Sequence, residues 1–228
     1  MLAPCSAVVG YWNPLQIGEP MTGEPGSVGF VESNAILPYT DAEFIGFFRH
    51  AEIKHGRVAM AAFVGFSVQA LGIHFPGDIA PGISYESISA AGGPGDQWDA
   101  VPTAGKLQIF SFIALLEFIG ESDYALGKSG MKHYMRGGKP GSFPSIRQDG
   151  VVPHPVPLDF FDPFGFQKKL SPEQKATKLL AEVNNGRLAM IGIMGYVSAS
   201  KGLIVPGLDS LPIKSYAGEY MAPFEGAW

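Results

Sequence analysis

The sequence predicts an all-α membrane protein with three transmembrane helices, in which the first and third helices cross as a pseudo-two-fold pair and long irregular loops connect them. Three observations predict this fold class: a ten-residue block that occurs twice, three apolar stretches, and basic residues that gather on one side of those stretches. We expect residues 1–228 to form a single domain, with helices at approximately 44–71, 106–120 and 176–205.

The repeated block reads AEIKHGRVAM at 51–60 and AEVNNGRLAM at 181–190, and each copy runs directly into an apolar stretch. A carboxylate, a neutral polar residue three positions later and an arginine five positions later are costly to place at the start of a hydrophobic helix. Because the whole set occurs twice, we expect a pseudo-symmetric pair of helices that carries the same chemistry on each member.

The three apolar stretches predict the helices in order. The first expected helix is polar at its start and apolar from Val58, the second has its heart at 107–117, and the third is apolar over 188–199. None is an uninterrupted apolar run of about 20 residues, the length that a bilayer core requires. Three buried helices of a soluble protein therefore remain an open alternative on length alone.

The placement of charge favours the membrane. The connection 74–105 contains four acidic residues and no lysine or arginine. The connection after the second helix is rich in basic residues: Lys128, Lys132, Arg136, Lys139, Arg147, Lys168, Lys169, Lys175 and Lys178. The positive-inside rule predicts that this second connection and the amino terminus lie on the same, positive side of the membrane.

Overall composition excludes other classes of protein. Charged residues make up only 16% of the chain, and the net charge of -5 offers no basic surface for nucleic acid, so we expect no nucleic-acid partner. Cys5 is the single cysteine, which excludes an internal disulfide framework and any metal site built from several cysteines.

Helix geometry constrains the charged residues of the repeat. Glu52 and Arg57 lie five positions apart, about 140° around a helix, so they cannot face each other. If the first and third helices cross, Arg187 reaches Glu52 and Arg57 reaches Glu182, and each charge in the low-dielectric interior is paired. Rows of small residues would allow the close approach: Gly56, Ala59 and Ala62 on one helix and Gly186, Ala189, Gly192 and Gly195 on the other.

The same repeat carries candidate metal ligands. A carboxylate neutralised by arginine still offers an oxygen lone pair, and a neutral imidazole or amide offers one as well. Glu52 with His55, and Glu182 with Asn185, would present such lone pairs outward from two helices. They do not converge on one point, as the ligands of a protein metal site must. One axial ligand for each metal suggests a magnesium tetrapyrrole.

On these residues the chain resembles the three-helix light-harvesting chlorophyll-binding proteins of plants and algae, and the resemblance extends over most of its length. It implies that magnesium is present only within chlorophyll, and that Arg57 and Arg187 form interhelical ion pairs that support the ligands. It implies six magnesium ligands: Glu52, His55, Gln108, Glu117, Glu182 and Asn185. Gln108 and Glu117 lie on opposite faces of the middle helix, and the alternative is that they are polar residues at its start and its far boundary.

The resemblance also implies carotenoid sites and a branch of the family. Asn13-Pro14 and Asp162-Pro163 match positions that hold the ends of two carotenoids. The second connection is similar to that of the algal red-lineage branch, which implies chlorophyll a, chlorophyll c and carotenoids of the fucoxanthin, peridinin or diadinoxanthin type. Three further histidines remain open between extra ligands and ordinary loop residues: His74, His133 and His154.

The function that the resemblance implies is that of a light-harvesting antenna, which passes excitation energy to a photosystem. A photoprotective protein that quenches excitation on the same scaffold is the alternative. An enzyme is not expected, because the chain shows no nucleophile–base pair, phosphate loop or convergent ligand set. The implied location is the chloroplast thylakoid membrane, crossed several times. The implied partners are thylakoid lipids, the core of photosystem I or II, and other antenna subunits.

Overall fold

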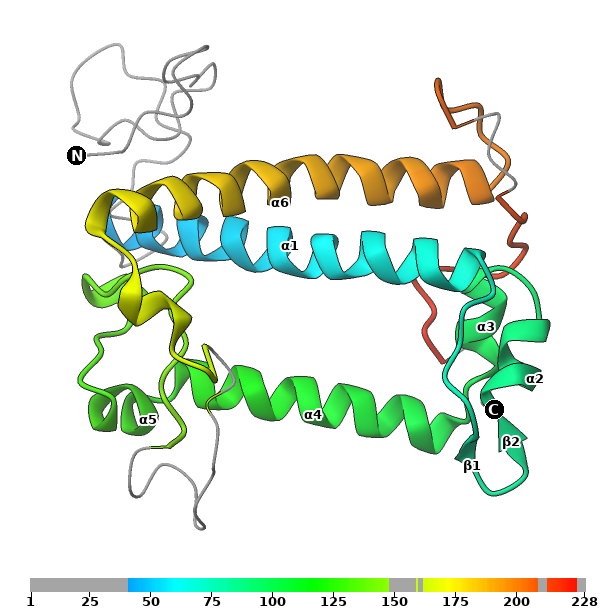
Figure 1. Cartoon of the computed structure of the whole chain (residues 1–228), viewed down its shortest axis with the longest axis horizontal. Helices are drawn as coiled ribbons and strands as arrows, with labels where there is room; N and C mark the ends of the chain where they lie inside the picture. The colour runs from blue at the N-terminus through cyan, green and yellow to red at the C-terminus, as the bar shows by residue number, and fades with distance from the viewer. Residues whose placement is uncertain (1–40, 148–158, 160–161, 209–212, 225–228) are drawn as a thin grey trace, which may run out of the picture.

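Two long parallel helices and one shorter helix dominate the fold. The computed structural model describes residues 41–147, 159, 162–208 and 213–224. Helices α1 (Asp41–Ala70) and α6 (Pro172–Ser200) lie side by side and run in the same direction, whereas α4 (Thr103–Glu121) runs the opposite way (Figure 1). The two connections between the long helices therefore lie at opposite ends of the molecule.

Local sequence signals set the beginning and the end of helix α6. At its start, the Ser171 side chain accepts a hydrogen bond from the Gln174 N–H, and Pro172 occupies the first turn. The expected end near residue 205 is wrong, because α6 stops at Ser200. Gly202 adopts a φ of +82°, and the Leu203 N–H turns back to the Ser198 carbonyl at 3.1 Å, which closes the helix.

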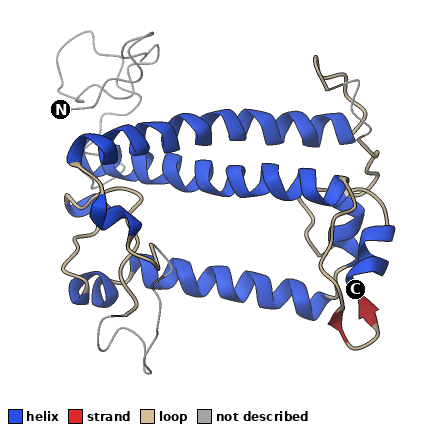
Figure 2. Cartoon of the chain, in the orientation of Figure 1, coloured by secondary structure: helices blue, strands red, loops and turns tan. Residues whose placement is uncertain are grey.

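The connections are less irregular than the sequence predicts (Figure 2). At one end lie the antiparallel strands β1 (Asp78–Ala80) and β2 (Ile83–Ser84), followed by α2 (Tyr85–Ala90) and α3 (Pro94–Ala100). At the other end lie α5 (Asp123–Lys128), η1 (Tyr134–Arg136) and η2 (Phe166–Lys169). These helices complete at most two turns, and the two strands are shorter still. Hydrophobic periodicity needs a longer stretch of sequence, so it cannot reveal any of these elements.

The packed centre of the long pair consists of small residues. Gly56 and Gly186 are both buried and meet backbone to backbone. Ala59 and Ala189, one turn further along, are 6% and 8% exposed. Beyond them the Tyr196 ring stacks on Phe63 and Phe66, with centroids 4.7 and 5.1 Å apart. The predicted rows of small residues thus lie in this interface at their first two positions on each helix.

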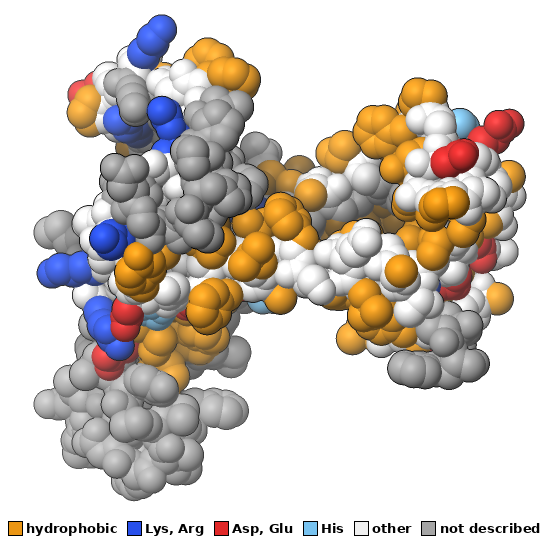
Figure 3. All heavy atoms as spheres, turned by 90° about the horizontal axis from the view of Figure 1, so that it is seen from below, with side chains coloured by type: hydrophobic (Ala, Val, Ile, Leu, Met, Phe, Trp, Pro, Cys, Tyr) orange, Lys and Arg blue, Asp and Glu red, His pale blue; other side chains and the backbone are white. Residues whose placement is uncertain are grey.

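The outer faces of the long helices are apolar and exposed. Within the described residues, α4 is the one helix that is long and apolar enough to cross a membrane. Leu107, Phe112 and Phe118 on this helix are 52, 51 and 72% exposed, so α4 is not the buried core helix that a soluble bundle would contain. Figure 3 shows apolar side chains along the narrow middle of the molecule. Large exposed apolar side chains in such numbers normally meet lipid, ligand or another protein.

Charge is unequally distributed between the two ends. On the face shown in Figure 3, most Lys and Arg side chains lie at one end, and the other end shows mainly Asp and Glu. Three lysines that the sequence argument did not consider lie at the acidic end, and each has a local partner. Lys106 is buried with its ammonium 5.5 Å from the Trp98 ring centroid, while Lys201 and Lys214 hydrogen-bond to backbone carbonyls.

Candidate functional site

Two reciprocal ion pairs join the first turns of the repeated block. The Arg57 Nε lies 2.6 Å from Glu182 Oε1, and the Arg187 Nε lies 2.5 Å from Glu52 Oε1. This is the cross-pairing that helix geometry predicts, and it flanks the contact between the two glycines. Arg57 also donates through Nη1 to the Gly141 carbonyl at 2.6 Å, which ties the long second connection to the helix pair.

In each pair the arginine neutralises the carboxylate but bonds to only one of its two oxygens. The arginine hydrogen bonds reach Oε1 of Glu52 and Oε1 of Glu182, and no described residue donates to either Oε2. The two side chains are 34% and 29% exposed, so neither is sealed inside the helix interface. An ionised carboxylate oxygen beside a fixed cation is a suitable single donor to a hard ion such as Mg²⁺.

The residue three positions later supplies a second donor on each helix. His55 is exposed, and its Nδ1 donates to the Ala51 carbonyl at 2.8 Å. A carbonyl oxygen only accepts, so the neutral ring keeps its lone pair on Nε2, the arrangement usual for a metal-binding imidazole. Asn185 is exposed at the equivalent position of α6, and its amide makes no hydrogen bond to a described residue.

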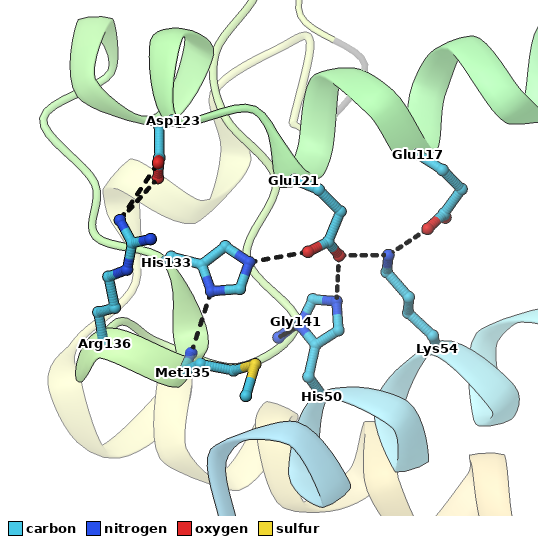
Figure 4. Close-up of polar contacts among 9 residues, drawn as sticks. All are labelled: His50, Lys54, Glu117, Glu121, Asp123, His133, Met135, Arg136 and Gly141. Carbon is cyan, nitrogen blue, oxygen red and sulfur yellow. Dashed lines mark hydrogen bonds and ion pairs between the residues drawn. The ribbon is translucent and has the colours of Figure 1, made fainter. Parts of the chain in front are cut away.

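The two candidate ligands of the middle helix differ in their surroundings. Gln108 is exposed and has no partner among the described residues. Glu117 forms an ion pair with Lys54 of α1, as Figure 4 shows. Glu117 therefore resembles Glu52 in being a carboxylate neutralised by a cation from a neighbouring helix. The two residues lie about 14 Å apart along α4, so they cannot act on one metal.

A polar cluster that sequence reasoning missed fastens α1 to the end of α4 (Figure 4). His133 Nε2 lies 2.8 Å from Glu121 Oε2, and the buried His50 accepts the Gly141 N–H at 3.1 Å. The Tyr134 ring stacks on His50 with centroids 3.9 Å apart. Burial, reinforced by the Glu121 charge, raises the pKa of the Tyr134 phenol to about 12, so the phenol stays neutral at physiological pH.

The three histidines left open fall into different settings. His133 belongs to the polar cluster and is engaged with Glu121. His74 is exposed at the far end of α1, with Nδ1 donating to the Phe75 carbonyl at 3.1 Å. His154 lies outside the described residues, as do Asn13 and Pro14 of the first expected carotenoid site.

The second expected carotenoid site forms a tight turn. Asp162 adopts a φ of +52°, its backbone carbonyl accepts the Gly165 N–H at 3.0 Å, and its Oδ1 accepts the Phe166 N–H at 2.7 Å. Asp162 and Pro163 form part of the wall of a cavity of about 570 Å³ at the basic end of the molecule.

Comparison with known proteins assigns this arrangement to a family. The family model for chlorophyll A-B binding proteins matches residues 5–201, which include both copies of the repeat and all three long helices. The chain belongs to the chlorophyll A-B binding protein family. Such a family is a pigment-binding one and not a family of enzymes. Membership also removes the soluble-bundle alternative, because the family consists of membrane antenna proteins.

Its relatives within the family include algal proteins. The chain is 36% identical over 179 residues to the chloroplastic fucoxanthin-chlorophyll a-c binding protein of Trieres chinensis, covering 76% of this chain and 74% of the relative. It is 31% identical over 181 residues to protein F of the same kind from Phaeodactylum tricornutum, covering 78% and 77%. The red-lineage branch predicted for this chlorophyll A-B binding protein is thereby confirmed.

Proposed function

We propose that this protein is a light-harvesting antenna subunit of the chloroplast thylakoid membrane, which binds chlorophylls and carotenoids and passes excitation energy to a photosystem. The observation that carries the proposal is the doubled set of outward-facing donors beside the glycine contact. In each copy a carboxylate is neutralised by an arginine from the other helix, and a neutral donor lies one turn away. Bound chlorophyll supplies the light absorption and energy transfer; the protein supplies ligation, spacing and exclusion of water.

The pigments follow from the relatives. Their names specify fucoxanthin and chlorophylls a and c, so we infer that this chain takes chlorophyll a, chlorophyll c and a fucoxanthin-type carotenoid. The same names describe pigment binding and give no support to the quenching alternative. An antenna of this family associates with a photosystem and with other antenna subunits, and we assign this chain the same general partners.

Three membrane spans are part of the proposal. At 1.5 Å per residue, α4 is about 28 Å long, close to the roughly 30 Å hydrocarbon core, and α1 and α6 are each about 44 Å. The long helices can cross the core and extend into one interface. Their composition falls short of a simple apolar span because of the charged repeat, and the reciprocal ion pairs reduce the cost of burying those charges.

The orientation gives a direct prediction. We expect the connection that contains α5 and η1 to face the stroma and the one that contains α2 and α3 to face the lumen, because basic residues gather in the former. Trypsin added to thylakoids with the stromal face exposed should cut at the exposed Lys128 and Lys132. Inside-out vesicles should instead be cut at the exposed Lys201 and Lys214. Cleavage at Lys201 in the first preparation and protection of Lys132 would reverse the assignment.

Ligation is tested by reconstitution with extracted pigments. His55→Ala and Asn185→Ala should each lose about one chlorophyll per polypeptide and retain the fold, because neither removes a charge. Asn184→Ala, an exposed amide one position away, is the matched control and should keep the full complement. Pigments are counted by chromatography, and fluorescence excitation spectra measure transfer from carotenoid to chlorophyll.

Different results would contradict the ligand assignment and the antenna function. If both ligand variants keep every chlorophyll, the third position of the repeat serves helix packing and the ligand assignment is wrong. If the wild-type chain binds no pigment, or binds it without energy transfer from carotenoid to chlorophyll, the antenna function itself is wrong.

A further inference from the structure

Two aromatic side chains from other parts of the chain hold the start of α4. The Trp98 ring of α3 meets the Phe110 ring edge-on, with centroids 6.2 Å apart, and lies 5.5 Å from the Lys106 ammonium. The Phe224 ring lies 5.5 Å from Phe110, centroid to centroid. We propose that Trp98 and Phe224, the aromatic clamp, are positioning residues for Gln108 and the chlorophyll that it binds. This inference rests on the antenna function proposed above, because it needs Gln108 to be a pigment ligand.

The segment that carries Phe224 is anchored before it reaches α4. In Figure 1 this segment, 213–224, returns from the end of α6 toward α3. Tyr216 is 5% exposed, its backbone N–H donates to the Ser200 carbonyl at 2.8 Å, and its hydroxyl donates to Asp99 Oδ2 at 2.9 Å. One buried side chain therefore fastens the segment both to the end of α6 and to α3.

Trp98 joins the same segment to α4. Its indole Nε1 donates to the Pro223 carbonyl at 3.0 Å, next to Phe224 in the sequence. The ring of the same indole contacts Phe110 of α4. Tryptophan combines a large apolar surface with one directional donor, so it can fix a backbone on one side and a helix on the other.

Helix geometry extends the effect of the clamp to Gln108. Lys106 and Phe110 lie four positions apart, so they share one face of α4, which we call the clamp face. Gln108 lies two positions from each, about 160° around the helix, and it is exposed. A helix turns as one body about its axis. Holding the clamp face therefore sets the direction in which Gln108 presents its ligand atom.

Ions hold the other end of the clamp face. Glu117 and Glu121 follow Phe110 by seven and eleven positions, within about 20° of the same direction around the helix. Both carboxylates pair with Lys54 of α1. The two ends of α4 are thus fastened by different chemistry. A change in the aromatic clamp should disturb the pigment on Gln108 and leave the pigment on Glu117 in place.

Two subtractions identify the absorption bands of the two pigments. Protein is reconstituted with extracted pigments, and the spectra of Gln108→Ala and Glu117→Ala are each subtracted from that of the wild type. The same subtractions are then made in every clamp or control variant. Chlorophyll per polypeptide is counted in parallel by chromatography.

The variants are chosen to separate the clamp from general aromatic packing. Trp98→Ala and Phe224→Ala each remove one ring of the clamp, and Trp98→Phe is the conservative variant that keeps a ring. Phe75→Ala is the matched control. It removes a 74% exposed ring of the same end, whose ring contact within the described residues is with Tyr85 of α2 at 6.0 Å.

Both alanine variants of the clamp should shift the Gln108 band and leave the Glu117 band and the chlorophyll count unchanged. The shift arises because the pigment changes its angle and distance to its neighbours. Trp98→Phe should shift the band less, and Phe75→Ala should not shift it. An unmoved Gln108 band in both alanine variants would overturn the positioning role. An equal shift of both bands, or the same shift in the control, would indicate general loosening and would also overturn it.

A distance measurement tests the clamp without relying on any pigment assignment. Spin labels are attached to Ala104→Cys at the start of α4 and Leu203→Cys beyond α6, both exposed, in a Cys5→Ser background. Pulsed electron paramagnetic resonance should give a narrow distance distribution with the clamp intact and with Phe75→Ala, and a broader one with Phe224→Ala. An equally narrow distribution in Phe224→Ala would show that the clamp does not hold α4.

Failure of the clamp and failure of the antenna function give different results. If Gln108→Ala keeps every chlorophyll, the ligand assignment of Gln108 is wrong and the positioning role falls with it, while the spin labels still report whether the clamp holds the helix. A wild type that binds no chlorophyll would count against the antenna function, whatever the distance distribution.

Discussion

Replacing Arg57 with Leu is expected to block assembly of the pigmented protein. Glu182 would then keep its negative charge in the helix interface with no counter-ion, and Gly141 would lose the donor that holds the second connection in place. Removing one partner of a pair in a low-dielectric interior costs about 3–5 kcal/mol, a large part of the stability of a domain of this size. Arg187→Leu should have a similar effect, because Glu52 would then lose its counter-ion in the same interface.

A charge-matched control tests whether position or charge causes the loss. Arg136 pairs with Asp123 at 3.2 Å, but the two side chains are 71% and 67% exposed, where an ion pair contributes at most about 1 kcal/mol. Arg136→Leu should therefore assemble normally. The measurements are pigment per polypeptide after reconstitution and the temperature at which the visible circular dichroism is lost. If Arg57→Leu matched Arg136→Leu in both, the reciprocal pairs would not be what holds the helices together.

Adding a single methyl group where the long helices touch should have the second large effect. A Cβ built on Gly56 lies 3.0 Å from the Gly186 Cα, and one built on Gly186 lies 2.9 Å from the Gly56 Cα. Both neighbours are backbone, so the contact can be relieved only by moving the helices apart. We expect Gly56→Ala and Gly186→Ala each to cost about 1–3 kcal/mol, the usual range for overpacking. The double variant should lose more than the sum, because two methyl groups then meet.

Gly65 provides the internal comparison for these variants. It lies in the same helix as Gly56, and a Cβ added there meets nothing within 4 Å. Gly65→Ala should be neutral or stabilising, since Ala favours a helix by about 1 kcal/mol over Gly. The measurement is again the temperature at which each variant loses its visible circular dichroism. Equal midpoints for Gly56→Ala and Gly65→Ala would mean that the close contact is not needed for assembly.

The sequence by itself determined the features that follow from the repeated block and from the apolar stretches. Two copies of one block, each with Glu and Arg five positions apart, can satisfy their charges only by exchange between helices, and Arg57 with Glu182 is that exchange. The apolar stretches located the three long helices, because a helix of that length repeats its pattern over many turns. Donors such as His55 could be recognised as outward-facing from their spacing alone.

Tertiary structure decided what depends on contacts between distant and dissimilar segments. The two copies differ in formal charge at one position of the repeat, where Lys54 in the first corresponds to Asn184 in the second. Nothing in either copy reveals that α4 carries Glu117 and Glu121 to Lys54, while Asn184 is left exposed. Among the described residues, the ion pairs between the middle helix and the long pair reach α1 and none reaches α6, which breaks the two-fold symmetry that the repeat implies. That asymmetry arises from packing between elements more than sixty residues apart, which no local periodicity encodes.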